Sequence, residues 1–563
     1  MEDSEIIGKE FRFGFHLSAI PDVRRDTHVV KEVIHYKDGT SKPHLRIIEN
    51  FKRPFWITKE HYQKHKDKKE CELLDRVTQY TATESGLARA VLTRLGSRYN
   101  GKKTLRDALP SPYIYGLDIS GLTMMKYYYS KKYPDFNTPY TMCALDTEVD
   151  IDTGELLILS VCTTDNIYVT ILDRMVENRN NPEEQLKYLY DKYIPDCDLK
   201  EKINVTFDIC TDELQMIVNA FKKVHEWQPD FLAIWNISYD MEVLLKVLEK
   251  SEVDPKDIFS DPSLPPELRE FKFVKGQIQK VTESGVLKPL EPREQWHTVK
   301  CPASFYWIDA MSAYHFVRVG TKNVPGGYSL DNILTTELGE GYKKLKFKDE
   351  VAEYLDGPDW HKYMVAKRPL EYIIYNCWDV MSMLELDKKT NDLAVSMPLL
   401  SGPSDFSIFN SGPKKLVNEL HFFYLDNGLV LGTKGIENDD DKILGLDSWI
   451  VLLSNYYVGA EDGEYIEEDA NTRIDRIANN IRGFVYDADQ SSGYPSDTLT
   501  ANVSKDTTMR EIVTIGDIDK DDFKLNNINL IFGKVNHVDY VTSMMNFPTL
   551  QTLADMVRKE KVS

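Results

Sequence analysis

Between residues 141 and 172, apolar positions follow the pattern of β-strands. Residues 141–149 alternate, a turn follows at 152–154, and two further strand-like segments cover 156–162 and 167–172. Strands of this length separated by short turns are typical of hairpins, so the three segments predict a meander.

After this meander, the apolar residues adopt helical spacing. A helix is predicted from about Asp212, with Thr211 as its N-cap, because apolar residues recur every three or four positions as far as Val224. The short apolar run 231–235 predicts a buried strand, and residues 236–240 open another helix. A meander followed by helix, strand and helix indicates an α/β domain.

The chain of 563 residues is long enough for several domains, and the fold class expected is α/β and α+β multidomain. The α/β domain covers 141–395 and ends with a helix at 370–386. Within it, the stretch 251–300 is rich in Pro and charge and is predicted to run over the surface. The other parts are a mixed N-terminal domain, 1–140, continued by the helical and connecting residues 396–455, and a C-terminal part, 456–563, with a new strand at 483–488.

Composition excludes several classes of protein. Hydrophobic residues make up 42% of the chain, which is unlike a disordered protein, and there is no run of about 18 apolar residues to cross a membrane. The acidic residues 1–5 do not resemble a signal peptide. Seven scattered cysteines without a C-x-x-C pair predict free thiols in a reducing compartment.

The net charge of the chain is -21. This balance argues against a protein that binds nucleic acid through general electrostatic attraction. It is compatible with an enzyme that holds DNA in a local groove and carries metal-binding carboxylates.

Three acidic motifs occur in order along the α/β domain. Asp146 and Glu148 are two apart on a predicted strand and therefore share a face. Asp240 follows a buried strand at the start of a helix, and Tyr375 lies four residues before Asp379 on another helix. In isolation each motif is explained as well by an exposed strand face, a helix cap or a surface pair.

In combination, D-x-E, N-x-x-Y-D and Y-x-x-x-D resemble the motifs of the DEDD exonucleases, in the subtype with a tyrosine, on an RNase H-like fold. The resemblance implies that the four acids hold two divalent cations, Mg²⁺ or Mn²⁺, which suits their hard oxygen ligands. It also implies that Tyr375 orients the attacking water and that Asn236 and Tyr239 contact DNA.

A second resemblance lies near the C-terminal end. The segment 489–496, DQSSGYPS, is similar to motif A of family B DNA polymerases, in which a Leu stands at the position of Gly493. The segment 457–460, YVGA, resembles the Y-x-G-G/A motif of that family, and 326–331, GGYSLD, resembles a stretch in T-even bacteriophage polymerases. The resemblance implies three sets of palm residues: a catalytic and metal site at Asp489 and Gln490, a dNTP site at Ser492, Gly493 and Tyr494, and DNA contacts at Tyr457 and Gly459.

Two polymerase motifs are missing, K-x-x-x-N-x-x-Y-G and Y-x-D-T-D. The acidic segment 515–519 is better explained as a solvated loop. The chain is therefore expected to be the N-terminal part of a phage-type polymerase, with 456–563 as the first part of the palm. Either a separate C-terminal chain supplies the fingers, motif C and thumb, or the chain is truncated.

The partners expected are primer-template DNA, single-stranded 3′ ends, that C-terminal chain and, as a further candidate, a sliding clamp. The expected location is the cytoplasm of an infected bacterial host, with no membrane. Two alternatives remain: a stand-alone 3′–5′ exonuclease with a polymerase remnant, and a non-catalytic scaffold for DNA or a partner.

Overall fold

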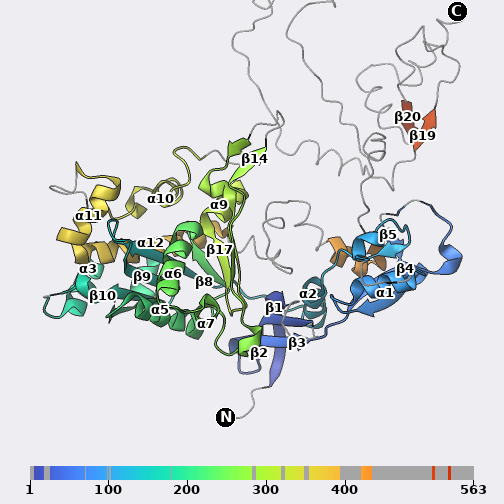
Figure 1. The fold of residues 1–563 in the computed structure, drawn as a ribbon, viewed down its shortest axis with the longest axis horizontal. Helices are drawn as coiled ribbons and strands as arrows, with labels where there is room; N and C mark the ends of the chain where they lie inside the picture. The colour runs from blue at the N-terminus through green and yellow to red at the C-terminus, as the bar shows by residue number, and fades with distance from the viewer. Residues whose placement is uncertain are drawn as a thin grey trace, which may run out of the picture. The chain divides into compact units, whose positions relative to one another are not determined.

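The computed structural model describes residues 5–17, 26–392, 420–433, 510–513 and 530–533, with short gaps at 67, 70, 98, 100–102, 178, 282–286, 319–323 and 348–353. Figure 1 shows its mixed helices and strands, in several sheets. The chain forms two compact units, Met1–Leu444 and Gly445–Ser563. In the second unit, the described elements are the antiparallel strands β19 (Arg510–Val513) and β20 (Leu530–Gly533).

The first unit contains a six-stranded mixed sheet with the strand order β11-β10-β9-β8-β12-β17. Its centre is an antiparallel meander, which confirms the prediction from the alternating segments. Strand β12 runs parallel to β8, and β17 runs parallel to β12. The bounds are β8 (Met142–Val149), β9 (Leu156–Cys162), β10 (Asn166–Leu172), β11 (Asn204–Cys210), β12 (Phe231–Ile234) and β17 (Tyr306–Asp309).

Every residue of β9 is buried, because helices cover both faces of the sheet. Helix α12 (Pro369–Thr390) packs on the face of β8 that carries Asp146, and α6 (Ile237–Lys250) contacts Thr147, which points to the other face. Helix α5 (Glu213–Trp227) packs against β9 and β10 (Figure 1). Among the described helices, none combines the length and apolarity needed to cross a membrane.

The predicted cap of α5 was wrong by one residue. Asp212 has extended backbone angles and its carboxylate accepts a hydrogen bond from the backbone N–H of Gln215, so Asp212 is the N-cap. Thr211 precedes the cap, and its N–H and hydroxyl both donate to the Gln215 side chain. Thr211 therefore supports the first turn from outside the helix.

The expectation that 251–300 runs over the surface was only partly right. The hairpin of β14 (Gln279–Val281) and β15 (Leu287–Pro289) is exposed. However, α7 (Pro255–Phe259) buries the Phe259 ring completely against aromatic core residues. The core also takes up β16 (Thr298–Lys300), which pairs with β13 (Lys272–Val274). A few apolar residues in this polar stretch are enough to anchor it.

The N-terminal residues form two three-stranded sheets and the helices α1 (Leu87–Arg94) and α2 (Gly121–Lys132), in agreement with the predicted mixture of strands and helices. One sheet has the order β1-β2-β3 and the other the order β6-β4-β7. Strand β18 (Leu429–Leu431) pairs with β5 (Cys71–Leu73), so a segment beyond the α/β domain returns to this region. The remaining bounds are β1 (Ile6–Leu17), β2 (Thr27–Tyr36), β3 (Ser41–Glu49), β4 (Arg53–Thr58), β6 (Val77–Ala82) and β7 (Ile114–Tyr115).

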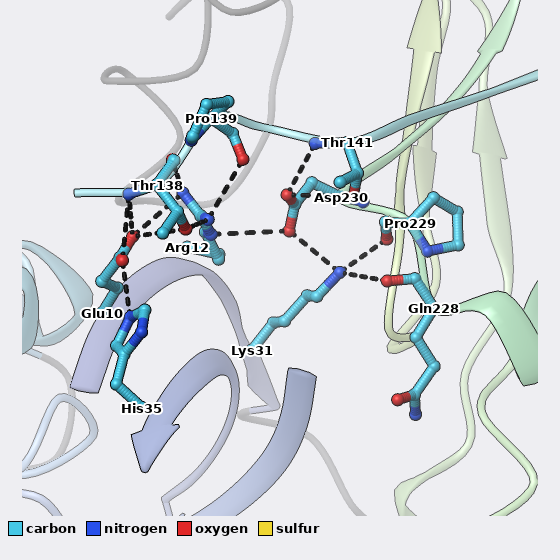
Figure 2. A network of polar contacts seen from close by, with 10 residues as sticks. All are labelled: Glu10, Arg12, Lys31, His35, Thr138, Pro139, Thr141, Gln228, Pro229 and Asp230. Carbon is cyan, nitrogen blue, oxygen red and sulfur yellow. Dashed lines mark hydrogen bonds and ion pairs between the residues drawn. The ribbon is translucent and has the colours of Figure 1, made fainter. Parts of the chain in front are cut away.

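A buried lysine joins the N-terminal sheet to the α/β domain. Figure 2 shows the Lys31 ammonium of β2 donating to the backbone carbonyls of Gln228 and Pro229, at 2.8 and 2.6 Å. It also forms an ion pair of 2.9 Å with Asp230. Burial lowers the pKa of Lys31 to about 8, although Asp230 favours its charged form. These three partners satisfy an ammonium group that would otherwise be costly to bury.

Asp230 connects this contact to the neighbouring parallel strands β8 and β12. It immediately precedes β12, and its second carboxylate oxygen accepts a hydrogen bond of 2.9 Å from the backbone N–H of Thr141, the residue before β8. Arg12 of β1 lies 3.7 Å from the same carboxylate and donates to the Thr138 carbonyl (Figure 2). The N-terminal sheet thus holds the beginnings of β8 and β12 together.

We expect Lys31→Met to destabilise the protein by about 3–5 kcal/mol, because it removes the ammonium that pairs with the buried Asp230 Oδ1 and donates to two backbone carbonyls. The matched control is Lys37→Met, since Lys37 forms an ion pair of the same 2.9 Å length with Glu5 but both side chains are exposed. Lys37→Met should change little. Urea unfolding measures both variants, and equal effects would contradict this account.

Candidate metal centre

One pocket of the α/β domain, with a volume of about 290 Å³, brings the three acidic motifs together. Its lining comes from the end of β8, the junction of β12 and α6, the start of α10 (Leu330–Leu338), and α12. All the residues assigned to the exonuclease motifs line it: Asp146, Glu148, Asn236, Tyr239, Asp240, Tyr375 and Asp379.

Three of the four acids lie close enough to share an ion. Asp146 and Glu148 project from the same face of β8, as strand alternation predicts, and Asp379 faces them from α12. One carboxylate oxygen of each lies within 4.8 Å of the others. Glu148 and Asp379 are buried, at 8% and 1% exposure.

Asp240 is held apart from this group of three. It lies in the first turn of α6, and its Oδ1 accepts hydrogen bonds from the N–H of Thr147, at 3.0 Å, and from the Thr147 hydroxyl, at 2.6 Å. Thr147 stands between Asp146 and Glu148 but points to the opposite face of β8. The fourth acid therefore lines the pocket without entering the group of three.

One face of α12 supplies hydrogen-bond donors to the acids of β8. The Asn376 side-chain amide donates to Asp146 Oδ2 at 2.6 Å, and the Tyr372 hydroxyl donates to Glu148 Oε2. Asn376 in turn accepts from the Ser160 hydroxyl of β9. Asn376 and Tyr372 are fully buried, so their position relative to β8 is fixed.

Lys344 brings a positive charge into the pocket. Its ammonium lies 2.5 Å from Asp379 Oδ2 and 3.0 Å from the Tyr375 hydroxyl. Among the described residues that line the pocket, it is the one Lys or Arg. Burial disfavours the ammonium, but Asp379 and the other nearby groups raise the pKa of Lys344 well above its ordinary value.

The backbone around Lys344 is fixed by three side chains. Asp331 Oδ1 accepts a hydrogen bond from the Lys344 N–H at 3.0 Å. The indole N–H of Trp378 donates to the Lys343 carbonyl at 2.9 Å, and that of Trp360 donates to the Lys346 carbonyl at 2.7 Å. Lys344 thus reaches the acids from an irregular segment that is held on both sides.

Lys344, Tyr372 and Asn376 were not predicted from the sequence. A signal existed for two of them, because Tyr372, Tyr375, Asn376 and Asp379 recur at the spacing of one helix face. Lys344 lies in a loop with several other lysines, and residue spacing in a loop does not show which of them points towards the acids.

Burial and mutual repulsion disfavour ionisation of the acids. Burial, and then the neighbouring carboxylates, raise the pKa of Asp146 well above its ordinary value. Burial raises the pKa of Glu148 to about 8 and that of Asp240 to about 6. It also raises the pKa of Asp379, although Lys344 opposes this shift. The Lys344 ammonium can balance the charge of only one of the four carboxylates. Ionisation of the others would therefore be favoured by an additional cation.

The residues present fit a divalent cation. The donor set consists of carboxylate oxygens, which hard cations such as Mg²⁺ and Mn²⁺ prefer. Asp379 Oδ1 is buried and has no hydrogen-bond partner among the described residues. A buried carboxylate oxygen without a donor is costly unless a cation occupies its free side.

The predicted palm residues cannot be placed. Those assigned to metal, nucleotide and DNA contacts lie outside the described residues: Tyr457, Gly459, Asp489, Gln490, Ser492, Gly493 and Tyr494.

No protein-family model matches the chain, and no curated protein matches it.

The pKa shift of Glu148 predicts a pH dependence of stability in EDTA. Its pKa is about 8 in the folded protein against an ordinary 4.5, so the folded form binds more protons in this window. The free energy of unfolding should therefore fall as pH rises from 4.5 to 8. Urea unfolding at several pH values should give a shallower slope for Glu148→Gln. An unchanged slope would contradict the assignment of this shift to Glu148.

Proposed function

We propose that the α/β domain is a metal-dependent 3′–5′ exonuclease acting on single-stranded DNA ends. The observation that carries the proposal is the convergence of three separate motifs on one pocket, with one carboxylate oxygen each of Asp146, Glu148 and Asp379 within 4.8 Å of the others. The chance that unrelated exposed acids converge in this way, on a partly apolar wall, is small.

We also propose an RNase H-like fold for residues 141–395. The antiparallel meander, joined to parallel strands and covered by helices on both faces, supports this assignment. The acids stand where β8 ends and where β12 leads into α6, at one edge of the sheet. Ligands of open α/β sheets bind at such an edge.

The acids, Lys344 and Tyr375 of the pocket have the following roles in this proposal. Asp146, Glu148 and Asp379, with Asp240 beside them, would hold one or two Mg²⁺ or Mn²⁺ ions. When bound, these ions would activate a water and stabilise the leaving 3′ oxygen. Tyr375, 3.0 Å from the Lys344 ammonium, would orient the attacking water with its hydroxyl.

The remaining lining suits an unpaired nucleotide. Trp235, Tyr239 and Leu330 add aromatic and apolar surface beside the acids, and Tyr239 is 48% exposed. Bases of single strands stack on such side chains without sequence preference. Asn236 offers a polar side chain next to Tyr239.

For the whole chain, we propose the N-terminal part of a family B DNA polymerase. This wider proposal rests on the resemblance of 489–496 and 457–460 to polymerase motifs. Asp489 would hold metal in one half of a palm, Tyr494 would lie under the incoming sugar, and carboxylates from the other half of the palm would complete the site. Two-metal nucleotidyl transfer needs carboxylates from both halves.

Replacing both β8 acids by alanine should abolish digestion. We expect Asp146→Ala with Glu148→Ala to reduce Mg²⁺-dependent degradation of single-stranded DNA by about 10³-fold or more. The unfolding midpoint should be kept or raised, because the substitutions relieve carboxylate repulsion. The matched control is Asp152→Ala, an exposed acid just beyond β8 that pairs with Lys362 outside the pocket. If the double variant digests DNA like this control, the site assignment is wrong.

The 563-residue chain by itself should digest DNA but not extend a primer. Adding a polypeptide that carries the missing motifs should restore synthesis, since a palm can be completed across a large apolar interface. Asp489→Ala should then stop synthesis and leave digestion intact. Primer extension by the chain alone, which survives Asp489→Ala, would show that the polymerase assignment is wrong.

A further inference from the structure

Tyr372 connects a proposed metal ligand to a histidine. The Tyr372 side chain is fully buried on α12, and its hydroxyl donates to Glu148 Oε2. His361, on α11 (Gly357–Lys367), places Nδ1 at 2.7 Å from the same hydroxyl. The three groups form a chain of hydrogen bonds that ends at the pocket wall, since His361 also lines the pocket.

The direction of these hydrogen bonds follows from the number of protons. A hydroxyl has one proton, and Tyr372 gives it to Glu148. When Glu148 is ionised, as a metal ligand must be, the Tyr372 proton is committed to Glu148, so His361 Nδ1 carries a proton and donates to Tyr372. His361 Nδ1 lies 3.6 Å from Glu148 Oε2, which exceeds hydrogen-bond distance, so His361 acts on Glu148 through Tyr372.

Ring packing fixes the Tyr372 hydroxyl in place. The Tyr372 and Tyr375 rings are stacked, with centroids 5.8 Å apart and an interplanar angle of 13°. The Trp360 ring meets both edge to face, at 5.9 and 5.1 Å. A ring held from several sides loses little further entropy when its hydroxyl binds a carboxylate.

We propose that Tyr372 is a positioning residue for Glu148 and that His361 orients the Tyr372 hydroxyl. The inference rests on the proposed function, in which Glu148 is a metal ligand. Tyr372 fixes the rotation of the carboxylate by binding Oε2, so that Glu148 meets an arriving cation without reorganising. Such outer partners of metal ligands typically change metal affinity or activity by about 10–100-fold when they are removed.

The first test is Tyr372→Phe in the full chain, with Mn²⁺ binding measured by calorimetry in the absence of DNA. We expect the dissociation constant for Mn²⁺ to rise about 10-fold or more, and the Mn²⁺ concentration for half-maximal digestion to rise in parallel. Raised Mn²⁺ should restore much of the rate. The matched control is Tyr190→Phe, because the buried Tyr190 hydroxyl also contacts α12, at Met381, but no carboxylate.

The second test separates the two nitrogens of His361. In His361→Asn the amide N–H₂ can replace the Nδ1 donor, whereas in His361→Gln it reaches the position of Nε2. We expect the Asn variant to bind Mn²⁺ nearly as well as the parent, and the Gln variant to bind it more weakly. Tyr372→Phe combined with His361→Gln should be no weaker than Tyr372→Phe alone, because His361 acts through that hydroxyl.

These outcomes distinguish the inference from the function on which it rests. A parent chain that neither binds Mn²⁺ nor digests DNA would overturn the proposed exonuclease. A parent that does both, with Tyr372→Phe like the Tyr190→Phe control, would overturn the positioning role alone. If Tyr372→Phe does not fold, the test rests on His361→Asn and His361→Gln. Equal Mn²⁺ affinity of these two variants would reject the positioning role of Tyr372.

Discussion

The geometry of the pocket depends on holding four carboxylates close together, three of them buried: Glu148, Asp240 and Asp379. Without hydrogen-bond donors, these carboxylates would repel one another and move apart. Instead, each carboxylate is tied to a separate donor group: Asn376 for Asp146, Tyr372 for Glu148, Thr147 for Asp240 and Lys344 for Asp379. Three of these donors are neutral, so they fix positions without cancelling charge. The donors therefore hold the carboxylates in position but leave most of their negative charge unbalanced. A metal site requires this combination before an ion binds.

The same sheet carries the acids at one end and the contact with the N-terminal sheet at the other. Lys31 and Asp230 hold the beginnings of β8 and β12, and the acids follow where these strands end. Because a β-strand transmits its register along its length, a shift at Asp230 would move Asp146 as well. The N-terminal region thus contributes to the geometry of a pocket that it does not line.

The elements of this domain that could be predicted from the sequence are those whose apolar residues repeat with the period of a strand or a helix. The meander, α6 and α12 were found because apolar residues repeat, and Asp146, Asp240 and Asp379 because the acidic motifs occur in order on these predicted elements. Several elements were not predicted, among them β11, β17 and α3 (Pro182–Tyr193). The four residues of β17 are too few to show a period, whereas the apolar alternation in β11 and the helical spacing in α3 were present in the sequence but were not used. Lys344 could not be predicted, because two indole N–H groups and Asp331 define its position, and these are tertiary contacts.

The strongly negative charge of the chain can be reconciled with a DNA substrate at this pocket. A phosphate approaching four carboxylates and one ammonium is repelled, even though aromatic side chains beside the acids favour a base. Bound divalent cations would reverse the sign of the local field. In the proposed exonuclease, the bound metal would therefore control where DNA can bind as well as the chemistry. A chain of net charge -21 would then bind nucleic acid only where cations are held, which favours recognition of an end over general attraction to a duplex.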